Sequence, residues 1–301
     1  MAEHDEYGYG SSDRVVSQRE MEEALAEGQV PYGAADVVMV QCVGSRDDEH
    51  PYCSRVCCTE AVKNALKLKE LNPEANVYIL YRDMRTYGRA EDYYRDAREK
   101  GVFFARFEPE NKPAVTPAGD KVKVKWYDII LGEDVEIEAD LVALAQGTWP
   151  DAAANKALAG MLKVPLTADG FFLEAHMKLR PVDFATEGVF VCGLAHAPKT
   201  IEESIAQAQA AAARAATILA KPTIKAEGRV AVVSERRCVG CGTCEAVCPY
   251  GAIEVNKEKM LAEVNAGLCK GCGSCAAACW SAAVDIAGVT HEQLLDAITA
   301  L

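Results

Sequence analysis

Two copies of one cysteine pattern lie in the last quarter of the chain and constrain it more than any other feature. Each copy reads C-x2-C-x2-C-x3-C, and together they hold eight of the thirteen cysteines. In this spacing three thiolates from one tight loop bind three irons of a [4Fe-4S] cubane, and the fourth cysteine binds the other cluster. The stretch is therefore an electron-transfer module. The copies comprise Cys238, Cys241, Cys244 and Cys248, and Cys269, Cys272, Cys275 and Cys279.

The spacing predicts two clusters that exchange their fourth ligands. The first set is Cys238, Cys241, Cys244 and Cys279, and the second set is Cys269, Cys272, Cys275 and Cys248. Gly240, Gly242, Gly271 and Gly273 suit this interpretation, because a loop wrapped so tightly needs backbone without side-chain bulk and often a positive φ. The stretch resembles a bacterial two-cluster ferredoxin, with Trp280 where that pattern has proline. The alternatives are a zinc site, which prefers two separated C-x2-C pairs, and a disulfide scaffold, which persists in oxidising compartments.

Composition limits the classes of partner. The chain has 301 residues, 50% of them apolar, so it can bury a sizeable core in two or three domains. Its net charge of −13 repels a phosphate backbone, so we expect no nucleic-acid partner. The amino terminus lacks the features of a secretory signal, and the longest apolar helix, near 201–220, is interrupted by polar residues. We therefore expect a soluble, cytoplasmic protein without membrane insertion, in a compartment that keeps thiols reduced.

Apolar runs alternate between strand and helix character over the first half of the chain. Residues 1–16 carry no periodicity and are expected to form an arm, after which Ser17 and Glu20 have capping-box spacing for a short helix ending near Gly28. Alternation of this kind predicts a parallel α/β unit. The expected elements are a strand from Ala35, a helix over 54–71, a strand over 77–81, a helix over 91–100, a strand over 102–107, a hairpin pair around 114–138 and a strand over 141–145.

A second group of cysteines lies at the first strand-to-helix corner of this unit. Cys42 closes the strand, and Cys53, Cys57 and Cys58 surround the start of the helix. The amino end of a helix favours thiolates and the net negative charge of a cluster. From spacing alone, buried apolar cysteines or zinc stay open as alternatives.

The run around this corner, QCVGSRDDEHPYCSRVCCTEAVKNALKLKELNPEANVYILYRDMRTYG, resembles the carboxyl-terminal portion of the A subunit of heterodisulfide reductase, an iron-sulfur flavoprotein. The later runs DLVALAQG and GFFLEAHMKLRPVDFATEGVFVCGLAHAPKTIEESIAQAQAAAARAA agree, and the likeness covers nearly the whole chain from about Glu6. In that family the corner binds a [4Fe-4S] cluster beside the flavin. The resemblance therefore implies a third cluster on Cys42, Cys53, Cys57 and Cys58, and it assigns Lys63 a catalytic position near the flavin N5.

The family core is similar to thioredoxin reductase, so the resemblance implies an α/β fold with a partial FAD/NAD(P)-type domain, followed by an α+β two-cluster ferredoxin domain. The expected parts are an arm and short helix over 1–30, a pyridine-nucleotide-type subdomain over 31–148, a returning FAD segment with a long helix over 149–222, and the ferredoxin domain over 223–301. A returning strand is expected over 188–193, and Thr200 and Glu203 have capping-box spacing for the long helix. The expected flavin contacts are Lys63, Gly147, Gly193, His196, Lys199 and Thr200. Cys192, expected inside the strand, is interpreted as a core residue.

No G-x-G-x-x-G motif follows any strand, which argues against direct NAD(P) binding and removes the segment that grips the FAD pyrophosphate. We infer that a partner chain supplies that segment and that FAD is shared. The sequence thus favours an electron-transfer subunit of a heterodisulfide-reductase-like complex, with three [4Fe-4S] clusters and part of an FAD site. The resemblance links it to electron bifurcation, with ferredoxin as a further partner. The alternative is a flavin-free ferredoxin-type adaptor that docks a larger oxidoreductase.

Overall fold

The computed structural model describes residues 6–223 and 228–300, which divide into two compact units. The first unit comprises residues up to Asn155 together with Thr167–Phe171 and Cys192–Ala208. The second comprises Lys156–Leu166, Phe172–Val191 and Gln209 onward.

A five-stranded parallel sheet forms the centre of the first unit, as the alternating pattern predicts. The strand order is β1-β8-β2-β3-β4, and every neighbouring pair is parallel. The central strand β2 is buried along nearly its whole length, which is why its sequence is continuously apolar. The strands are β1 (Val15–Ser17), β2 (Asp36–Val43), β3 (Asn76–Tyr81), β4 (Phe103–Arg106) and β8 (Leu141–Gln146).

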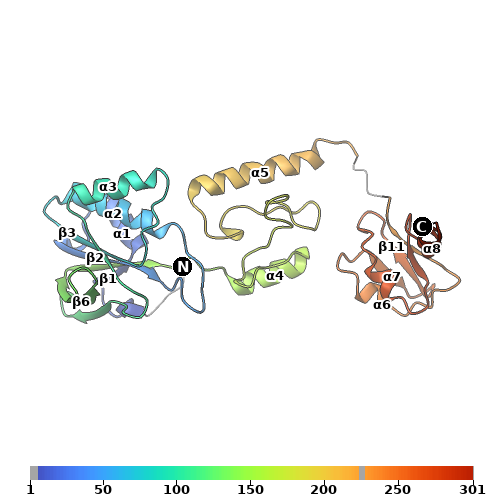
Figure 1. The fold of residues 1–301 in the computed structure, drawn as a ribbon, viewed down its shortest axis with the longest axis horizontal. Helices are drawn as coiled ribbons and strands as arrows, with labels where there is room; N and C mark the ends of the chain where they lie inside the picture. The colour runs from blue at the N-terminus through green and yellow to red at the C-terminus, as the bar shows by residue number, and fades with distance from the viewer. Residues whose placement is uncertain (1–5, 224–227, 301) are drawn as a thin grey trace. The chain divides into compact units, whose positions relative to one another are not determined.

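Three helices cover one face of this sheet (Figure 1). They are α1 (Gln18–Ala26), α2 (Cys57–Leu71) and α3 (Ala90–Glu99). Met21 and Leu25 of α1 and Leu68 of α2 are fully buried against the sheet. The capping box of α1 is confirmed, because the Ser17 hydroxyl accepts from the Glu20 N–H and the Glu20 carboxylate accepts from the Ser17 N–H.

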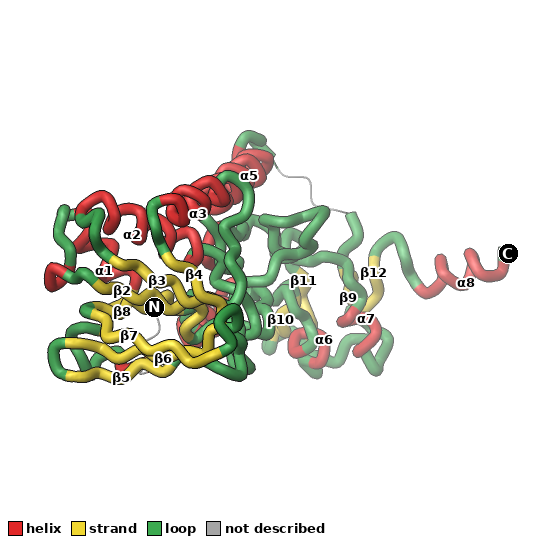
Figure 2. Tube along the Cα trace, turned by 60° about the vertical axis from the view of Figure 1, so that its left-hand side comes forward, coloured by secondary structure: helices red, strands yellow, loops and turns green. Residues whose placement is uncertain are grey.

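An antiparallel sheet of three strands packs on the opposite face (Figure 2). The expected hairpin pair forms, since β5 (Ala114–Ala118), β6 (Lys121–Asp128) and β7 (Glu133–Ala139) make two consecutive hairpins in that order. Val122, Val124 and Trp126 alternate inward along β6 and bury against the parallel sheet. This period of two gives a sheet with one buried face.

Three features of the secondary structure differ from the expectations. Within the expected arm, Val15–Ser17 forms strand β1 beside β8, because its short apolar run has a neighbour to pair with that the sequence does not reveal. Helix α2 begins at Cys57 instead of residue 54, because Arg55 has a φ of 66°, outside the helical region. The returning strand over 188–193 does not form, since Phe190 makes only a single bridge, to Asp183, and Cys192 is half-buried outside any strand.

Two further helices follow the first unit's sheet along the chain. The sequence expectations omit α4 (Ala152–Leu162), whereas α5 (Ile201–Leu219) has the expected bounds. The expected cap of α5 is confirmed, with the Thr200 N–H donating to Glu203 at 3.0 Å and the Glu203 N–H donating to the Thr200 hydroxyl at 3.3 Å. Among the described helices, none is long and apolar enough to cross a membrane.

The C-terminal part of the second unit is built from two similar halves. Strand β9 pairs with β12 and β10 pairs with β11, each antiparallel, and short helices α6 and α7 follow the cysteine loops. The elements are β9 (Ala231–Val233), α6 (Thr243–Ala246), β10 (Ile253–Asn256), β11 (Leu261–Val264), α7 (Ser274–Ala278) and β12 (Val284–Ile286).

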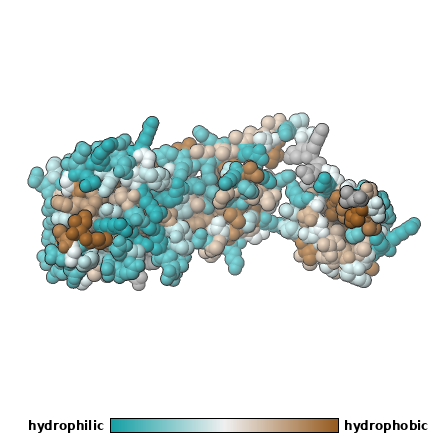
Figure 3. Space-filling view, in the orientation of Figure 1, coloured by the Kyte–Doolittle hydropathy of each residue, from teal (hydrophilic) through white to brown (hydrophobic). Residues whose placement is uncertain are grey.

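A final helix, α8 (His291–Thr299), follows these halves with its own capping box. Its apolar side chains Leu294, Leu295 and Ile298 are 49%, 60% and 67% exposed, so they do not bury against the described chain. Figure 3 shows apolar side chains gathered at this C-terminal end.

Candidate iron-sulfur and flavin sites

The two cysteine loops of the C-terminal halves have matching backbone geometry. Gly240 and Gly271 have φ of +63° and +59°, and Gly242 and Gly273 have φ of +79° and +84°. A Cβ on Gly240 would lie 2.7 Å from the carbonyl oxygen of Met260, and one on Gly271 would lie 2.4 Å from that of Arg229. Both loops therefore need glycine for conformation and for space, as the sequence predicts.

Backbone N–H groups point at cysteine sulfurs in symmetric pairs. The N–H of Ala231 donates to the sulfur of Cys269 at 3.3 Å, and its counterpart Ala262 donates to Cys238 at 3.5 Å. The N–H of Ala252 donates to Cys248 at 3.3 Å. The equivalent residue of the second half, Ala283, donates to Cys279 at 3.2 Å. Such N–H donors stabilise negative charge on cluster ligands, so these loops fit a pair of [4Fe-4S] clusters.

One of the two predicted ligand sets lines a common cavity. Four cysteines line one small cavity together with Pro249 and Ile253, and these four are the predicted second ligand set: Cys248, Cys269, Cys272 and Cys275. On the other side, burial raises the pKa of Cys244, and the nearby charges of Cys238 and Cys241 raise it further. Trp280, the neighbour of Cys279, donates a hydrogen bond to Cys241.

The four-cysteine corner of the first unit is also assembled. Cys42 is the last residue but one of β2 and has a φ of 61°, and Cys57 and Cys58 are the first two residues of α2. A hydrogen bond between the Cys57 thiol and the sulfur of Cys58 raises the pKa of Cys57, and burial raises it as well. Cys57 also lies close enough to Cys42 and Cys53 for their charges to raise this pKa further. The corner therefore gathers all four predicted sulfurs, three from the ends of regular elements and Cys53 from the loop between them.

Buried hydroxyls hold the loop of this corner in place. Ser45 and Ser54 are 3% and 1% exposed, and the Ser45 hydroxyl donates to the carbonyl of Tyr52 at 3.0 Å. The Ser54 hydroxyl accepts from the N–H of Thr148 at 2.9 Å, which joins the loop to the end of β8. Beside it, Gly147 has no room for a side chain, because a Cβ would lie 2.5 Å from the carbonyl oxygen of Gly44. The role of Gly147 in the structure is thus this close approach, and flavin contact stays a prediction.

Arginines surround the corner and favour thiolates there. Arg46 forms a hydrogen bond with Cys42 and an ion pair with Asp83 at 2.6 Å. The hydrogen bond from Cys57, followed by Arg85 and Arg46, lowers the pKa of Cys58 to about 7 against the effect of burial. One nitrogen of Arg46, Nη1, is buried without a hydrogen-bond partner among the described residues. Positive side chains with an unsatisfied donor fit a cluster, which carries net negative charge and acceptor sulfurs.

Left-handed backbone is concentrated at this corner. Cys42, Arg46 and Arg55 have φ of 61°, 61° and 66°, although none is glycine. Each such residue costs about 1–3 kcal/mol, and such strain persists where surrounding structure enforces it, often at functional sites. Arg55 illustrates the effect, because its turned N–H donates to the sulfur of Cys53 at 3.3 Å.

The predicted flavin contacts at the start of α5 lie together. Lys199 and Thr200 immediately precede the helix, and Gly193 has a φ of 63°. Gln207 connects this region, since its amide oxygen accepts from the Gly193 N–H at 2.9 Å and its nitrogen lies 3.0 Å from His196 Nδ1. Sequence reasoning overlooked the role of Gln207. The only signal in the sequence is that Gln207 is one of the polar residues that interrupt the apolar helix.

Lys63 lies on α2 and pairs with Glu22 of α1. Sequence reasoning also overlooked Arg55 as a bridging residue, although a basic side chain between two cysteine ligands was visible in the motif. Its guanidinium bonds to Glu203 at 2.6 Å.

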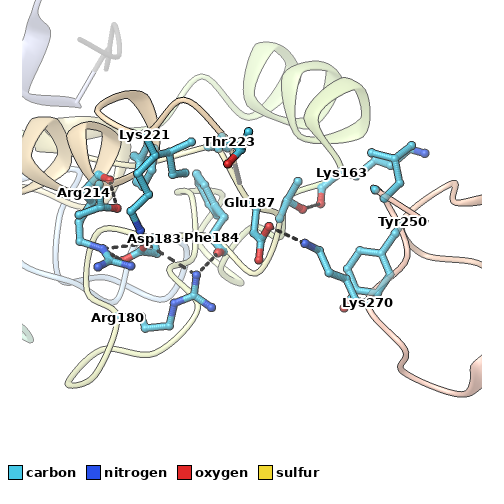
Figure 4. A pocket seen from close by; sticks show the side chains of 18 residues that line it. Lys163, Arg180, Asp183, Phe184, Glu187, Arg214, Lys221, Thr223, Tyr250 and Lys270 are labelled. Carbon is cyan, nitrogen blue, oxygen red and sulfur yellow. Dashed lines mark hydrogen bonds and ion pairs between the residues drawn. The ribbon is translucent and has the colours of Figure 1, made fainter. Parts of the chain in front are cut away.

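A charged cluster in the second unit is a further feature that the sequence does not indicate. Asp183 is 4% exposed, and both of its carboxylate oxygens accept from Nε of Arg214 at 3.2 Å. Arg180 lies 3.6 Å from the same carboxylate. Figure 4 shows these side chains at the wall of a cavity. The pairing fixes α5 to the segment before it and involves none of the predicted ligands.

The buried apolar interpretation keeps some support at the four-cysteine corner, because Cys57 and Cys58 pack with Ala145 in a buried apolar cluster. All thirteen cysteines lie within the described residues, and none of them forms a disulfide. Within residues 6–223 and 228–300, no three or more His, Cys, Asp or Glu side chains converge as ligands of one metal ion.

Comparison with known proteins agrees with this geometry. The 4Fe-4S dicluster domain family matches residues 237–283. The chain is 43% identical to an iron-sulfur A subunit of the CoB-CoM heterodisulfide reductase of Methanopyrus kandleri, over 84% of this chain and 40% of that protein. It is 44% identical to a protein of Archaeoglobus profundus that is named as similar to the heterodisulfide reductase A subunit, over 93% of this chain and 40% of that protein. The chain matches a part of the heterodisulfide reductase A subunit.

The predicted family is thereby confirmed, and the chain spans about two-fifths of the length of these curated relatives of the heterodisulfide reductase A subunit. The α/β class and the C-terminal ferredoxin-type domain are confirmed as well. Among solved structures, thioredoxin reductase of T. acidophilum is 16% identical with a TM-score of 0.43, covering 69% of this chain and 58% of that chain. The domain boundaries and the individual ligands stay predictions.

Proposed function

We propose that this chain is an electron-transfer component of a heterodisulfide-reductase-like complex and holds three [4Fe-4S] clusters. The observation that carries the proposal is the pair of cysteine loops whose matching N–H groups point at matching sulfurs. The relatives, named as heterodisulfide reductase subunits, support the same assignment. Two clusters are assigned to the C-terminal halves, and the third to Cys42, Cys53, Cys57 and Cys58.

When bound, such clusters accept and release one electron at a time. The chain's own residues bury several of these sulfurs and keep water away from them. Cys244 and Cys275 are each 6% exposed, and Cys57 and Cys58 are 4% and 3% exposed. Cys241 and Cys272 are exposed, so they are the sulfurs that would leave each C-terminal cluster accessible to an external electron carrier.

We further propose that the chain supplies only part of an FAD site and that another polypeptide supplies the segment that grips the pyrophosphate. The exposure of α5 supports this. Within the described residues 201–219 no side chain is buried, and Ile201 and Ile205 are 77% and 53% exposed. Such apolar exposure favours a covering partner. Lys199 and Thr200 at the amino end of α5 are the assigned flavin contacts, with His196 and Gly193 beside them, and Lys63 is assigned to the flavin N5.

The wider activity is also a proposal. One relative, from Methanococcus maripaludis, is named as the A subunit of an H(2)/formate:CoB-CoM heterodisulfide,ferredoxin reductase. We propose that this chain takes part in a related reaction that is linked to flavin-based electron bifurcation, with ferredoxin among its partners.

Iron and sulfide analysis of anaerobically purified chain tests the cluster assignment. We expect about a dozen irons per chain, and protection of Cys42, Cys53, Cys57 and Cys58 from alkylation until a chelator removes the iron. A Cys53→Ser variant should lose about a third of the iron, whereas the matched Cys192→Ser variant should lose none. Iron near eight per chain, with the four corner cysteines alkylated, would contradict the third cluster.

Flavin content tests the shared site separately. The isolated chain should hold little FAD, and the complex with its partner should hold it stoichiometrically. If flavin never appears in the joint complex while all clusters are present, the chain acts as a flavin-free ferredoxin-type adaptor instead.

A further inference from the structure

One arginine joins the four-cysteine corner to the amino end of α5. The Arg55 guanidinium donates to Glu203 at 2.6 Å, to the hydroxyl of Tyr87 at 2.8 Å and to the carbonyl of Pro198 at 3.3 Å. These three partners belong to two segments that are far from Arg55 in sequence but lie in the same compact unit. Arg55 is therefore the point at which the cysteine loop contacts the segment of the assigned flavin contacts.

The same residue also shapes the cysteine loop. Its φ of 66° directs its N–H to the sulfur of Cys53 at 3.3 Å, and this conformation delays the start of α2 to Cys57. Glycine would adopt this conformation with less strain. An arginine at this position therefore offers what glycine cannot, namely a side chain that contacts Glu203 of α5.

Glu203 has two bonds that use different oxygens. One oxygen accepts from the N–H of Thr200 and completes the helix cap, and the other accepts from Arg55. Burial acts to raise the pKa of Glu203, but the cap bond and Arg55 outweigh it and lower that pKa. The carboxylate is thus ionised. Through its bond with Arg55, it balances the positive charge of the guanidinium beside the loop that carries Cys53.

We propose that Arg55 is a positioning residue that couples the four-cysteine corner to the start of α5, so that a change at Glu203 alters the cluster held by Cys53. The inference rests on the proposed third cluster. It assigns to this chain a rigid connection between that cluster and the assigned flavin contacts.

A conservative change at Glu203 provides the sharpest test, because Glu203 lies far from the cysteines in sequence. Glu203→Gln keeps an acceptor for the helix cap but removes the charge that Arg55 binds. Glu202→Gln is the matched control, since Glu202 is exposed on the same turn and the change removes the same charge. Both are made in the full chain with its clusters loaded, and the corner cluster is followed by electron paramagnetic resonance during a redox titration.

We expect Glu203→Gln to raise the reduced fraction of the corner cluster severalfold at a fixed potential, because Arg55 is left without its counter-charge. Glu202→Gln should change it much less, and the effect of Glu203→Gln should disappear in an Arg55→Gln background. Equal effects of Glu203→Gln and Glu202→Gln would overturn the coupling while leaving the third cluster in place. Absence of any corner signal in the unmodified chain would instead refute the proposed function.

Hydrogen exchange supplies a second readout that does not depend on the cluster signal. Arg55→Lys keeps the charge but loses the fork that reaches several acceptors. The amides that follow Pro198, up to residue 207, should exchange faster in this variant, while those of α3 stay unchanged. Unchanged exchange over 198–207 would also count against the proposal.

Discussion

Lys63 of α2 forms an ion pair with Glu22 of α1. Both side chains are about half exposed, and Glu60 lies beside them on the same helix as Lys63. Burial, followed by the charge of Glu22, raises the pKa of Glu60 to about 6. Lys63 therefore neutralises part of a carboxylate pair, and any flavin at its assigned place would compete with Glu22 for it.

The first prediction concerns that competition. In the flavin-loaded complex, Lys63→Gln should lower the flavin reduction potential, because a positive charge near N5 stabilises the reduced, anionic form. Lys67→Gln is the matched control, since Lys67 lies one turn further along α2 and pairs with Glu70 at 3.2 Å. Spectroscopic redox titration measures both. Equal flavin reduction potentials in the two variants would contradict the assignment of Lys63 to the flavin site.

The second prediction concerns the pH dependence of stability. Because the folded pKa of Glu60 is about 6 and its unfolded pKa is about 4.5, the protonated form stabilises the fold. This stabilisation is complete below about pH 4.5 and is lost as the pH rises through about 6. Glu60→Gln should therefore be more stable than the unmodified chain at pH 7 by about 2 kcal/mol, and the difference should vanish near pH 4. Urea unfolding at the two pH values provides the measurement, and a constant difference would contradict it.

Local signals explain which parts of the fold the sequence predicts well. The caps at Ser17 and Thr200 depend on residues three positions apart, and both form as expected. The parallel strands follow from continuous apolar runs between glycines and helices. The cysteine loops follow from ligand spacing together with glycines at positions of positive φ, which other residues adopt only with strain.

The parts that sequence reasoning misses depend on contacts between distant segments. Strand β1 has only three residues, and it is defined by its pairing with β8, which is distant in sequence. The segment over 188–193 has strand composition, yet only the region of Asp183 lies alongside to pair with it. The bond between Arg55 and Glu203 joins residues 148 positions apart, so no local pattern indicates it.

The third prediction concerns space within the cysteine loops. Gly240→Ala would place a Cβ 2.7 Å from the backbone of Met260, whereas Gly288, with a φ of 81°, has open space around it. Both alanines carry the strain of a left-handed conformation, about 1–2 kcal/mol. Only Gly240→Ala adds a clash, about 1–3 kcal/mol more. We expect Gly240→Ala to lose iron on gel filtration while Gly288→Ala retains it, and equal retention would contradict the close approach.

The last prediction separates the two C-terminal clusters. The indole of Trp280 donates a hydrogen bond to the sulfur of Cys241, and the equivalent position in the other half is Pro249, which has no such donor. Hydrogen bonds to cluster sulfurs stabilise the reduced state and so raise the potential. Trp280→Phe keeps an aromatic ring but removes the donor, so it should lower the potential of the cluster held by Cys241 and leave the other unchanged.

The reciprocal variant provides the control for this prediction. The Cys272 thiol donates to the hydroxyl of Ser274 at 3.5 Å, and the same hydroxyl donates to the sulfur once Cys272 is a thiolate, which lowers the pKa of Cys272. Ser274→Ala should therefore lower the potential of the other cluster, leaving the one held by Cys241 unaffected. Redox titrations followed by electron paramagnetic resonance resolve the two signals when their potentials differ. A shift of the same signal in both variants would show that the hydrogen bonds act on one cluster only, and would refute the assignment of Cys241 and Cys272 to different clusters.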